Sequence, residues 1–320
     1  MQMAVYRDAV VTSCNANWLP AAAVALWSIA RHGLPENIDL VIFVHGSNAE
    51  DRANLDVFNR RHGTAIKLVP VEMQPPPSVD LGHWGVGTIL MLQLDRYIDH
   101  PYRRVLHVDV DVLAYRPIQD LLETDLRGRA FGAVDEVHWL NGTRRSSPGG
   151  IGMEADAPYF NAGVLLFDWR EIVDRQLLPK GLQLLANGAR WPLLNQDVLN
   201  VVSAGQWWPL DLRWNVTTTI AQYRNIDPWI RHFTSSAKPW TESCRHTEQQ
   251  YRTEYVRAFE GTNWEDFVHP GGGRWSRALF IHLIRRRFAF GRQRRLTRAL
   301  RAYSTTTDLS AKQRPVRLKE

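Results

Sequence analysis

The first seventy residues alternate short apolar runs with segments of helical periodicity, and this alternation limits the fold more than any other feature. The apolar runs are residues 9–13, 39–44 and 65–69, and the helical patterns between them are residues 21–30 and 49–61. This β-α-β-α-β order predicts an α/β fold with a mostly parallel sheet flanked by helices. Such sheets bind ligands at the carboxyl ends of their strands, where residues 14–20 are expected to form a loop.

The composition fits a globular chain, with 44% hydrophobic and 22% charged residues. No apolar stretch approaches the about 20 residues that a transmembrane helix needs. Residues 1–8 lack the basic and apolar regions of a signal peptide. The two cysteines, Cys14 and Cys244, lie far apart, which excludes a disulfide scaffold and any Cys-x-x-Cys motif. We therefore expect a cytoplasmic protein.

Residues 104–113 hold two acidic side chains at the end of an apolar strand. Side chains alternate along a strand, so Asp109 and Asp111 are expected to point in the same direction. Like charges at this spacing repel each other, and burial raises the pKa of a carboxyl group. A divalent cation relieves the repulsion, and carboxylate oxygens suit Mg²⁺ or Mn²⁺. An Asp-x-Asp spacing also occurs by chance, so a strand end without metal is the alternative.

Three later segments carry polar side chains that suit the same site, although each also has a purely structural interpretation. Residues 159–168 are expected to form a loop that runs into an apolar strand. The alternative is that this segment belongs only to the hydrophobic core. Residues 195–200 open a helix, where Gln196 is either a site residue or a cap. His232 precedes Lys238 by six residues. His232 is either a nitrogen ligand for a metal or a surface histidine, and Lys238 supplies a positive charge for phosphate.

Taken together and in this order, the segments resemble glycosyltransferase family 8, whose members are retaining enzymes that use UDP-sugars on a GT-A fold. The resemblance covers roughly residues 9–245. The matching elements are residues 15–18, 107–111, 132–135, 151–153, 159–164, 195–200 and 232–240. The resemblance implies a Rossmann-like GT-A catalytic domain over residues 1–245, followed by a basic helical region over residues 246–320.

The resemblance also implies a metal site and a phosphate contact. Asp109, Asp111 and His232 match the protein ligands of Mn²⁺, for which Mg²⁺ is the alternative. Asp109 thereby also belongs to the donor site, because the metal holds the UDP diphosphate. Lys238 matches the lysine that contacts the donor phosphate.

The remaining matched residues are expected around the nucleobase and the sugar. Around uracil these are Asn15, Asn17 and Trp18, and around the donor sugar they are the catalytic candidates Gln196, Asp135 and Asn161. The family implies transfer of galactose or glucose from UDP to a glycan acceptor, such as lipopolysaccharide or a surface polysaccharide. No dedicated nucleophile is evident, and the front-face mechanism of the family needs none, because departing UDP takes the proton of the acceptor.

Four residues depart from the family pattern. Met91 stands where an arginine is usual, Asn15 and Asn195 stand where aspartates are common, and Ser235 replaces a glycine. These departures favour an altered donor preference or a reduced rate. The alternative function is therefore a catalytically weak UDP-sugar-binding protein.

Residues 274–320 carry fourteen lysines and arginines against two acidic residues, although the whole chain has a net charge of only +6. Residues 294–303 combine helical apolar spacing with arginines, which predicts a basic amphipathic helix. This helix lies either in water on the catalytic domain or on an anionic membrane, where a glycolipid acceptor would be found at the inner face. Nucleic acid is the least favoured partner, because no recognised binding motif accompanies the charge.

Overall fold

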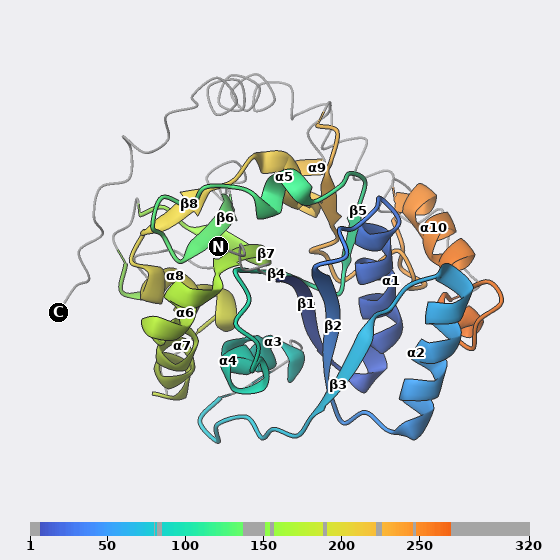
Figure 1. The fold of residues 1–320 in the computed structure, drawn as a ribbon, viewed down its shortest axis with the longest axis horizontal. Helices are drawn as coiled ribbons and strands as arrows, with labels where there is room; N and C mark the ends of the chain where they lie inside the picture. The colour runs from blue at the N-terminus through green and yellow to red at the C-terminus, as the bar shows by residue number, and fades with distance from the viewer. Residues whose placement is uncertain are drawn as a thin grey trace, which may run out of the picture.

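A seven-stranded sheet forms the centre of the molecule in the computed structural model, with the strand order β3-β2-β1-β4-β7-β6-β8 (Figure 1). The structure describes residues 7–79, 81, 85–136, 151–153, 157–187, 191–221, 226–245 and 248–269. The strands are β1 (Asp8–Asn15), β2 (Ile38–His45), β3 (Lys67–Val71), β4 (Arg104–Val108), β6 (Phe131–Asp135), β7 (Phe160–Asp168) and β8 (Trp207–Pro209).

Six of these strands run in one direction. β1 pairs in parallel with β2 and β4, β2 pairs in parallel with β3, and β6 pairs in parallel with β8. Only β7 is reversed, and it pairs antiparallel with both β4 and β6. The predicted mostly parallel sheet is confirmed.

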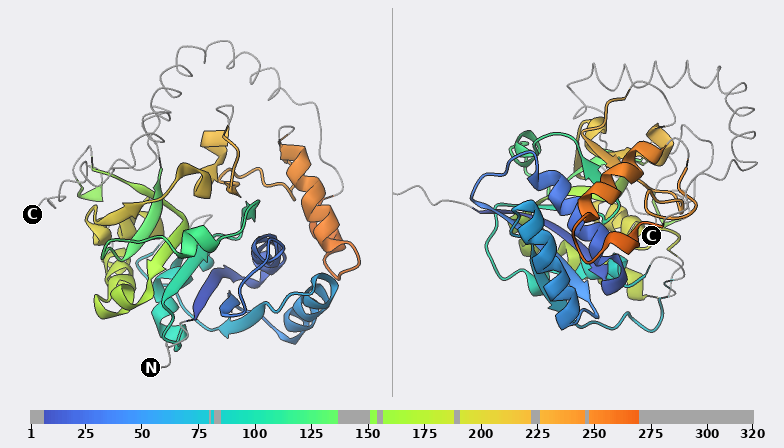
Figure 2. Two further views of the ribbon diagram at one scale, coloured as in Figure 1. Left: turned by 45° about the horizontal axis from the view of Figure 1, so that its top comes forward. Right: turned by 90° about the vertical axis from the view of Figure 1, so that its right-hand side faces the viewer.

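Alternate residues of the strands enter two separate hydrophobic cores, one on each face of the sheet. Val10 and Leu106 pack on the face covered by α1 (Leu19–Ala30), α2 (Ala49–His62) and α10 (Gln249–Phe259). Val11 and Val105 pack on the opposite face, against α6 (Trp169–Asp174), α7 (Leu177–Ala186) and α8 (Asn195–Ser203). Figure 2 shows α10 alongside α1 and α2. The helices therefore flank the sheet on both sides, as predicted.

The first five elements agree with the sequence prediction to within a few residues. Local signals fix their ends: the side chain of Asn48 and that of Asp51 form a reciprocal capping box at the start of α2. Gly63 ends this helix in the left-handed region, with φ of 62°. The loop predicted for residues 14–20 is wrong, because β1 continues to Asn15, a 3₁₀ helix spans Ala16–Trp18, and α1 starts at Leu19.

The prediction of one strand over residues 104–113 is also wrong. β4 ends at Val108, the chain turns, and β5 (Val112–Ala114) begins a second sheet. In that sheet β5 pairs with β10 (Ile230–His232), which pairs with β9 (Val216–Thr217). The alternation of side chains could not reveal this change, because the partner of β5 lies more than a hundred residues further along the chain.

The remaining elements are short. Residues 87–97 form three short elements: α3 (Gly87–Leu90), a 3₁₀ turn (Met91–Gln93) and α4 (Leu94–Tyr97). The run Ile89–Leu94 is buried throughout. The others are α5 (Gln119–Leu122), α9 (Thr218–Ala221) and 3₁₀ turns at Leu212–Asn215 and Glu265–Phe267.

α10 belongs to the hydrophobic core of the sheet. Tyr255 and Phe259 of α10 are fully buried in the core that contains α1 and α2. The division of the chain at residue 245 stays a prediction. The predicted basic helix of residues 294–303 lies outside the described residues. Among the helices that are described, none has the length and apolar character needed to cross a membrane.

Candidate functional site

The carboxyl edge of the sheet collects polar side chains from four strands. Asn15 ends β1, Asp109 follows the last residue of β4, and Asp135 ends β6. Because β7 is reversed, its first residues lie at the same edge, where Asp135 pairs with Phe160. Asn161 therefore joins the other three at this edge.

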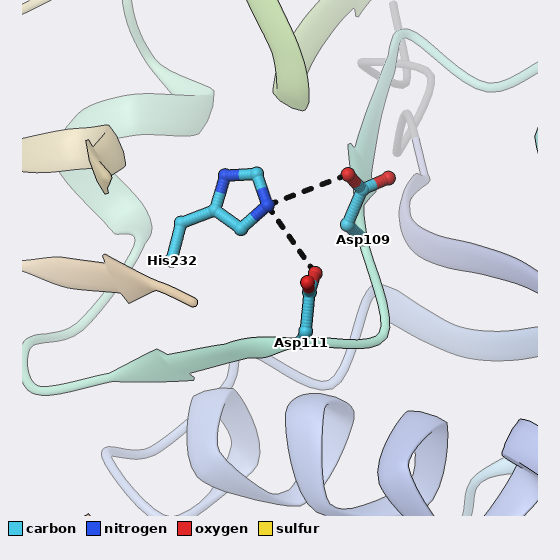
Figure 3. Close-up of side chains that lie close together, drawn as sticks. All are labelled: Asp109, Asp111 and His232. Atoms are coloured by element: carbon cyan, nitrogen blue, oxygen red, sulfur yellow. Dashed lines mark ion pairs between the residues drawn. The ribbon is translucent and has the colours of Figure 1, made fainter. Parts of the chain in front are cut away.

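Asp109, Asp111 and His232 come together at the point where the chain leaves the central sheet (Figure 3). The Nε2 atom of His232 lies 3.2 Å from Oδ1 of Asp111 and 3.5 Å from Oδ2 of Asp109. One potential ligand atom from each residue lies within 4.8 Å of the others. The pairing of β10 with β5 sets this arrangement, because it places His232 opposite Val112.

The two carboxylates converge for a reason other than the one predicted. They do not share the face of a single strand; they lie on a turn that is tied down on both sides. The N–H of Asp109 donates to the carbonyl of Gly163 on β7 at 2.9 Å, and the N–H of Phe233 donates to the carbonyl of Asp111 at 2.9 Å. The turn is therefore fixed by the central sheet and by the second sheet.

Gly163 leaves the space that the imidazole of His232 fills. A Cβ atom at this position would lie 2.1 Å from Cε1 and 2.5 Å from Nδ1 of His232. The side chain of His232 is itself 4% exposed, so the ring has little freedom to move away. Sequence analysis included Gly163 within a matching segment and gave it no role, because only the fold shows which ring approaches it.

The pKa values of the two carboxyl groups are shifted in opposite directions. Removal of water around the turn raises the pKa of Asp109 to about 6, and the neighbouring charge of Asp111 contributes to the rise. Burial acts on Asp111 in the same direction, but the Lys238 ammonium and His232 outweigh it and hold the pKa of Asp111 well below its usual range. Lys238 forms an ion pair with Asp111 and donates to the carbonyl of Phe233 at 2.6 Å.

The three side chains fit a divalent cation. They offer two carboxylates and one imidazole nitrogen, all converging from different parts of the chain, and this mixture of hard oxygen and borderline nitrogen ligands suits Mn²⁺ or Mg²⁺. Asp111 and His232 are buried. In the part of the chain that the structure describes, this is the one cluster of such ligands.

The residues predicted around uracil lie beside this cluster. Asn17 and Trp18 belong to the 3₁₀ helix after β1, and Trp18 is 36% exposed. Its ring meets that of Trp240 edge-on, with 5.9 Å between the ring centres. The Oδ1 atom of Asn15 is buried and has no hydrogen-bond partner within the described part of the chain. Such an acceptor needs a donor from a ligand or water to offset its desolvation.

The residues predicted around the sugar belong to a network of buried amides. Asn161 donates through Nδ2 to a carboxylate oxygen of Glu136 and accepts through Oδ1 from the N–H of Gly163 at 2.9 Å. The side chain of Gln196 accepts from the N–H of Ala162 at 3.0 Å and donates to the hydroxyl of Tyr159 at 3.2 Å. Asn161 and Gln196 therefore lie side by side on β7 and α8.

Two members of this network, Glu136 and Asn215, were not predicted from the sequence. Glu136 follows Asp135 directly, and burial raises its pKa to about 7. Asn215, fully buried, connects Asn161 with His232 through both ends of its amide. A second carboxylate next to a predicted site residue was an available signal for Glu136. Asn215 lies in a tryptophan-rich segment and gave none.

Two of the departures from the family pattern are in contact with each other. The amide of Asn195 donates to the sulfur of Met91 at 3.7 Å, and Met91 is fully buried. The pair is neutral, and Asn195 directly precedes Gln196 in the chain. Ser235, a third departure, donates to the carbonyl of Ala237 at 3.0 Å within the turn that leads to Lys238.

The comparisons with known proteins agree with this geometry. A model of glycosyl transferase family 8 matches residues 9–244. General stress protein A of Bacillus subtilis is 22% identical over an alignment of 253 residues, which covers 73% of this chain and 86% of that protein. A lipopolysaccharide 1,2-glucosyltransferase of Escherichia coli is 21% identical over 253 residues, covering 73% and 74%.

Solved structures show the same fold. The galactosyltransferase LgtC, in complex with donor and acceptor sugar analogues, superimposes with a TM-score of 0.68 at 21% identity, over 82% of this chain and all of that one. The glycosyltransferase GlyE of Streptococcus pneumoniae superimposes with a TM-score of 0.58 at 18% identity, over 82% and 62%. The sheet, its flanking helices and the acidic turn define a glycosyltransferase of the GT-A type. Within that class, the chain belongs to glycosyltransferase family 8.

Proposed function

We propose that this chain is a metal-dependent retaining glycosyltransferase that moves galactose or glucose from a UDP donor to a glycan acceptor. The convergence of Asp109, Asp111 and His232 at the carboxyl edge of the sheet carries the proposal. A Mn²⁺ ion bound there, with Mg²⁺ as the alternative, would neutralise the charge that develops on the diphosphate as it leaves. Lys238, now paired with Asp111, is the second positive charge available to that group.

Two features support a nucleobase site beside the metal. The unpartnered Oδ1 atom of Asn15 is an acceptor suited to a base N–H, although an amide oxygen accepts less strongly than a carboxylate. The exposed ring of Trp18, held by Trp240, offers an aromatic surface to the base. Asn17 lies between them in the chain, is exposed and belongs to the same 3₁₀ turn as Trp18.

The sugar is expected between the metal site and the amide network. Both lone pairs of Asn161 Oδ1 are used, by Gly163 and by Asn215, so Asn161 meets a sugar hydroxyl only as a donor. Gln196 uses its oxygen on the backbone of Ala162, which holds its amide in one orientation. Asp135 is the carboxylate at the end of β6 that we assign to the sugar hydroxyls.

Retention follows without a covalent intermediate if the acceptor attacks from the face that UDP leaves. A retaining mechanism of the glycosidase kind requires a carboxylate nucleophile about 5 Å from an acid. Gln196, an amide, cannot supply it, and we assign to Gln196 the stabilisation of the positively charged sugar ring. The departing phosphate then takes the proton of the acceptor hydroxyl, so that one glycosidic bond forms as the sugar–phosphate bond breaks.

The proposal for the acceptor and for the cellular location is based on the basic tail, residues 274–320. Fourteen lysines and arginines in residues 274–320 would hold the enzyme to an anionic membrane surface, where a glycolipid acceptor is found. This gives a peripheral enzyme at the inner face of the membrane. It predicts that vesicles with anionic lipid bind the whole chain and not a chain ending at residue 273.

A catalytically weak UDP-sugar-binding protein is the second candidate. The contact between Met91 and Asn195 favours it, because a neutral pair replaces two charges at the wall next to Gln196. The two candidates differ in turnover and agree in metal-dependent UDP binding.

The experiment is the release of UDP from a panel of UDP-sugars, with and without Mn²⁺ and without an acceptor, since slow hydrolysis of the donor requires no knowledge of the acceptor. We expect Mn²⁺-dependent release from one donor, and its loss in Asp111→Asn, which stays folded. Tight Mn²⁺-dependent UDP binding without release from any donor would favour the second candidate. Wild-type release by Asp111→Asn would overturn the metal assignment.

A further inference from the structure

The two nitrogens of His232 face different partners. Nε2 faces Asp109 and Asp111, and Nδ1 lies 2.9 Å from Oδ1 of Asn215. Both His232 and Asn215 are buried, so water cannot replace either contact. An amide and an imidazole can each be oriented in two ways, and this pair alone does not decide which nitrogen of the ring carries the proton.

The N–H of Gly163, two residues beyond Asn161 on β7, decides which nitrogen of His232 carries the proton. The N–H of Gly163 can only donate, and its acceptor at 2.9 Å is Oδ1 of Asn161. That contact directs Nδ2 of Asn161 to the carboxylate of Glu136, which accepts it. Oδ1 of Asn161 also lies 2.8 Å from the amide of Asn215, and since Oδ1 only accepts, the group facing it is Nδ2 of Asn215.

The orientation of Asn215 follows from that of Asn161. With its Nδ2 turned to Asn161, Asn215 presents its oxygen to His232. An oxygen accepts only from a protonated Nδ1, so the lone pair of a neutral His232 ring lies on Nε2. The N–H of Gly163 cannot flip, so it fixes the orientation of Asn161, then that of Asn215, and finally which ring nitrogen of His232 faces the two carboxylates.

We infer that Asn215 is a positioning residue that holds His232 with Nδ1 protonated and Nε2 directed at the metal site. The inference rests on the proposed metal-dependent function, which it deepens. The same series of hydrogen bonds continues from Asn215 to Asn161 and Glu136. The orientation of His232, the metal ligand, and that of Asn161, the proposed sugar contact, are therefore set together. Loss of such a partner of a metal-bound histidine typically weakens metal binding about 10–100-fold.

Asn215→Leu tests the inference, because leucine fills a similar space and cannot accept a hydrogen bond. Asn215→Asp is the complementary variant, since it keeps the acceptor oxygen for Nδ1. Asn200→Leu is the matched control: Asn200 is also a buried amide, but its partners are the backbone of Phe160 on β7 and the backbone carbonyl of Gln196, and not His232.

Two measurements are made on each full-length variant. Proton and nitrogen NMR of protein with ¹⁵N-labelled histidine, without metal, detects a slowly exchanging ring N–H, assigned to His232 by its absence in His232→Gln. Electron paramagnetic resonance then measures the affinity for Mn²⁺ alone. We expect Asn215→Leu to lose the protected N–H and to bind Mn²⁺ roughly 10–100-fold more weakly. We expect Asn215→Asp to keep the N–H, although it can no longer donate to Oδ1 of Asn161. We expect Asn200→Leu to keep the N–H and to bind Mn²⁺ within a few-fold of wild type.

An unchanged ring N–H in Asn215→Leu, or its absence from the wild-type protein, would overturn the inference. So would an equal loss of Mn²⁺ affinity in Asn200→Leu, because the effect would then be general destabilisation. A wild-type protein that shows the protected N–H and binds no Mn²⁺ would instead overturn the proposed metal-dependent function. The positioning of His232 by Asn215 would still stand in that case.

Discussion

The substitution Gly163→Ala tests how closely the metal site depends on the packing of β7. A methyl group at Gly163 would lie 2.1 Å from Cε1 of His232, whereas non-bonded carbons meet at about 3.5–4.0 Å. The ring would therefore have to move by more than about 1 Å. It cannot do so and keep both Asn215 at 2.9 Å and Asp111 at 3.2 Å.

The expected loss can be stated for binding and for stability. Displacement of the ring removes the orientation of a metal ligand, which typically weakens metal binding about 10–100-fold, so we expect Mn²⁺ affinity to fall by up to roughly 2.7 kcal/mol. Overpacking of a buried site costs about 1–3 kcal/mol of the free energy of unfolding. The variant should therefore fold, with a lower urea midpoint, and fail to bind the metal at concentrations that saturate the wild type.

Gly132→Ala is the control. Gly132 lies on β6 in the same sheet, and a Cβ atom there would lie 2.8 Å from a methyl carbon of Leu126. His232 is not among the residues that this Cβ atom would meet. It should lower the urea midpoint as Gly163→Ala does and leave Mn²⁺ affinity unchanged. Electron paramagnetic resonance of free Mn²⁺ gives both affinities. Wild-type affinity in Gly163→Ala would refute the reasoning, because the ring would then not occupy the space that the glycine leaves.

Three further predictions follow from the described contacts. Arg231→Met should cost about 3–5 kcal/mol in urea unfolding, because it leaves the carboxylate of Glu248 without its buried partner at 2.7 Å. Adding Glu248→Leu should recover the part of that loss that comes from the unpaired carboxylate, and not the part that comes from the carbonyls of Val216 and His232, to which Arg231 also donates. Glu136 has a pKa of about 7 in the folded chain against an ordinary 4.5, so its contribution to stability is complete below about pH 4.5 and is lost as the pH rises through 7. The urea midpoint of the metal-free wild type should therefore fall relative to that of Glu136→Gln over this range, and parallel pH profiles would disprove the assignment. Trp18→Ala should leave the 36% exposed position folded and weaken UDP binding about tenfold by calorimetry, as expected for a lost base–aromatic contact of about 1–3 kcal/mol; unchanged affinity would remove Trp18 from the nucleobase site.

The sequence predicted those parts of the fold that local patterns specify. The β-α-β-α-β order of the first seventy residues gave the parallel half of the sheet, because each element there has its own period and its own end signals, such as Asn48 and Gly63. The change of sheet between Val108 and Val112 was not predictable in this way. It depends on the pairing of β5 with β10, which no local pattern records.

The same distinction applies to the site. Asp109, Asp111 and His232 were selected from their residue types and their resemblance to family 8, and the structure brings them together. Gly163 and Asn215 have no chemistry of their own that a sequence pattern would mark. Their roles arise only from what they touch, namely the two sides of one imidazole ring.

The measurement that tests the central claim most directly is the affinity of the metal-stripped chain for UDP, by calorimetry, with and without Mn²⁺. We expect Mn²⁺ to strengthen UDP binding strongly, because Asp109, Asp111 and His232 would hold the ion against the diphosphate. We also expect this gain to disappear in Asp111→Asn. UDP binding that is equally strong without Mn²⁺, or no binding in either case, would contradict the account.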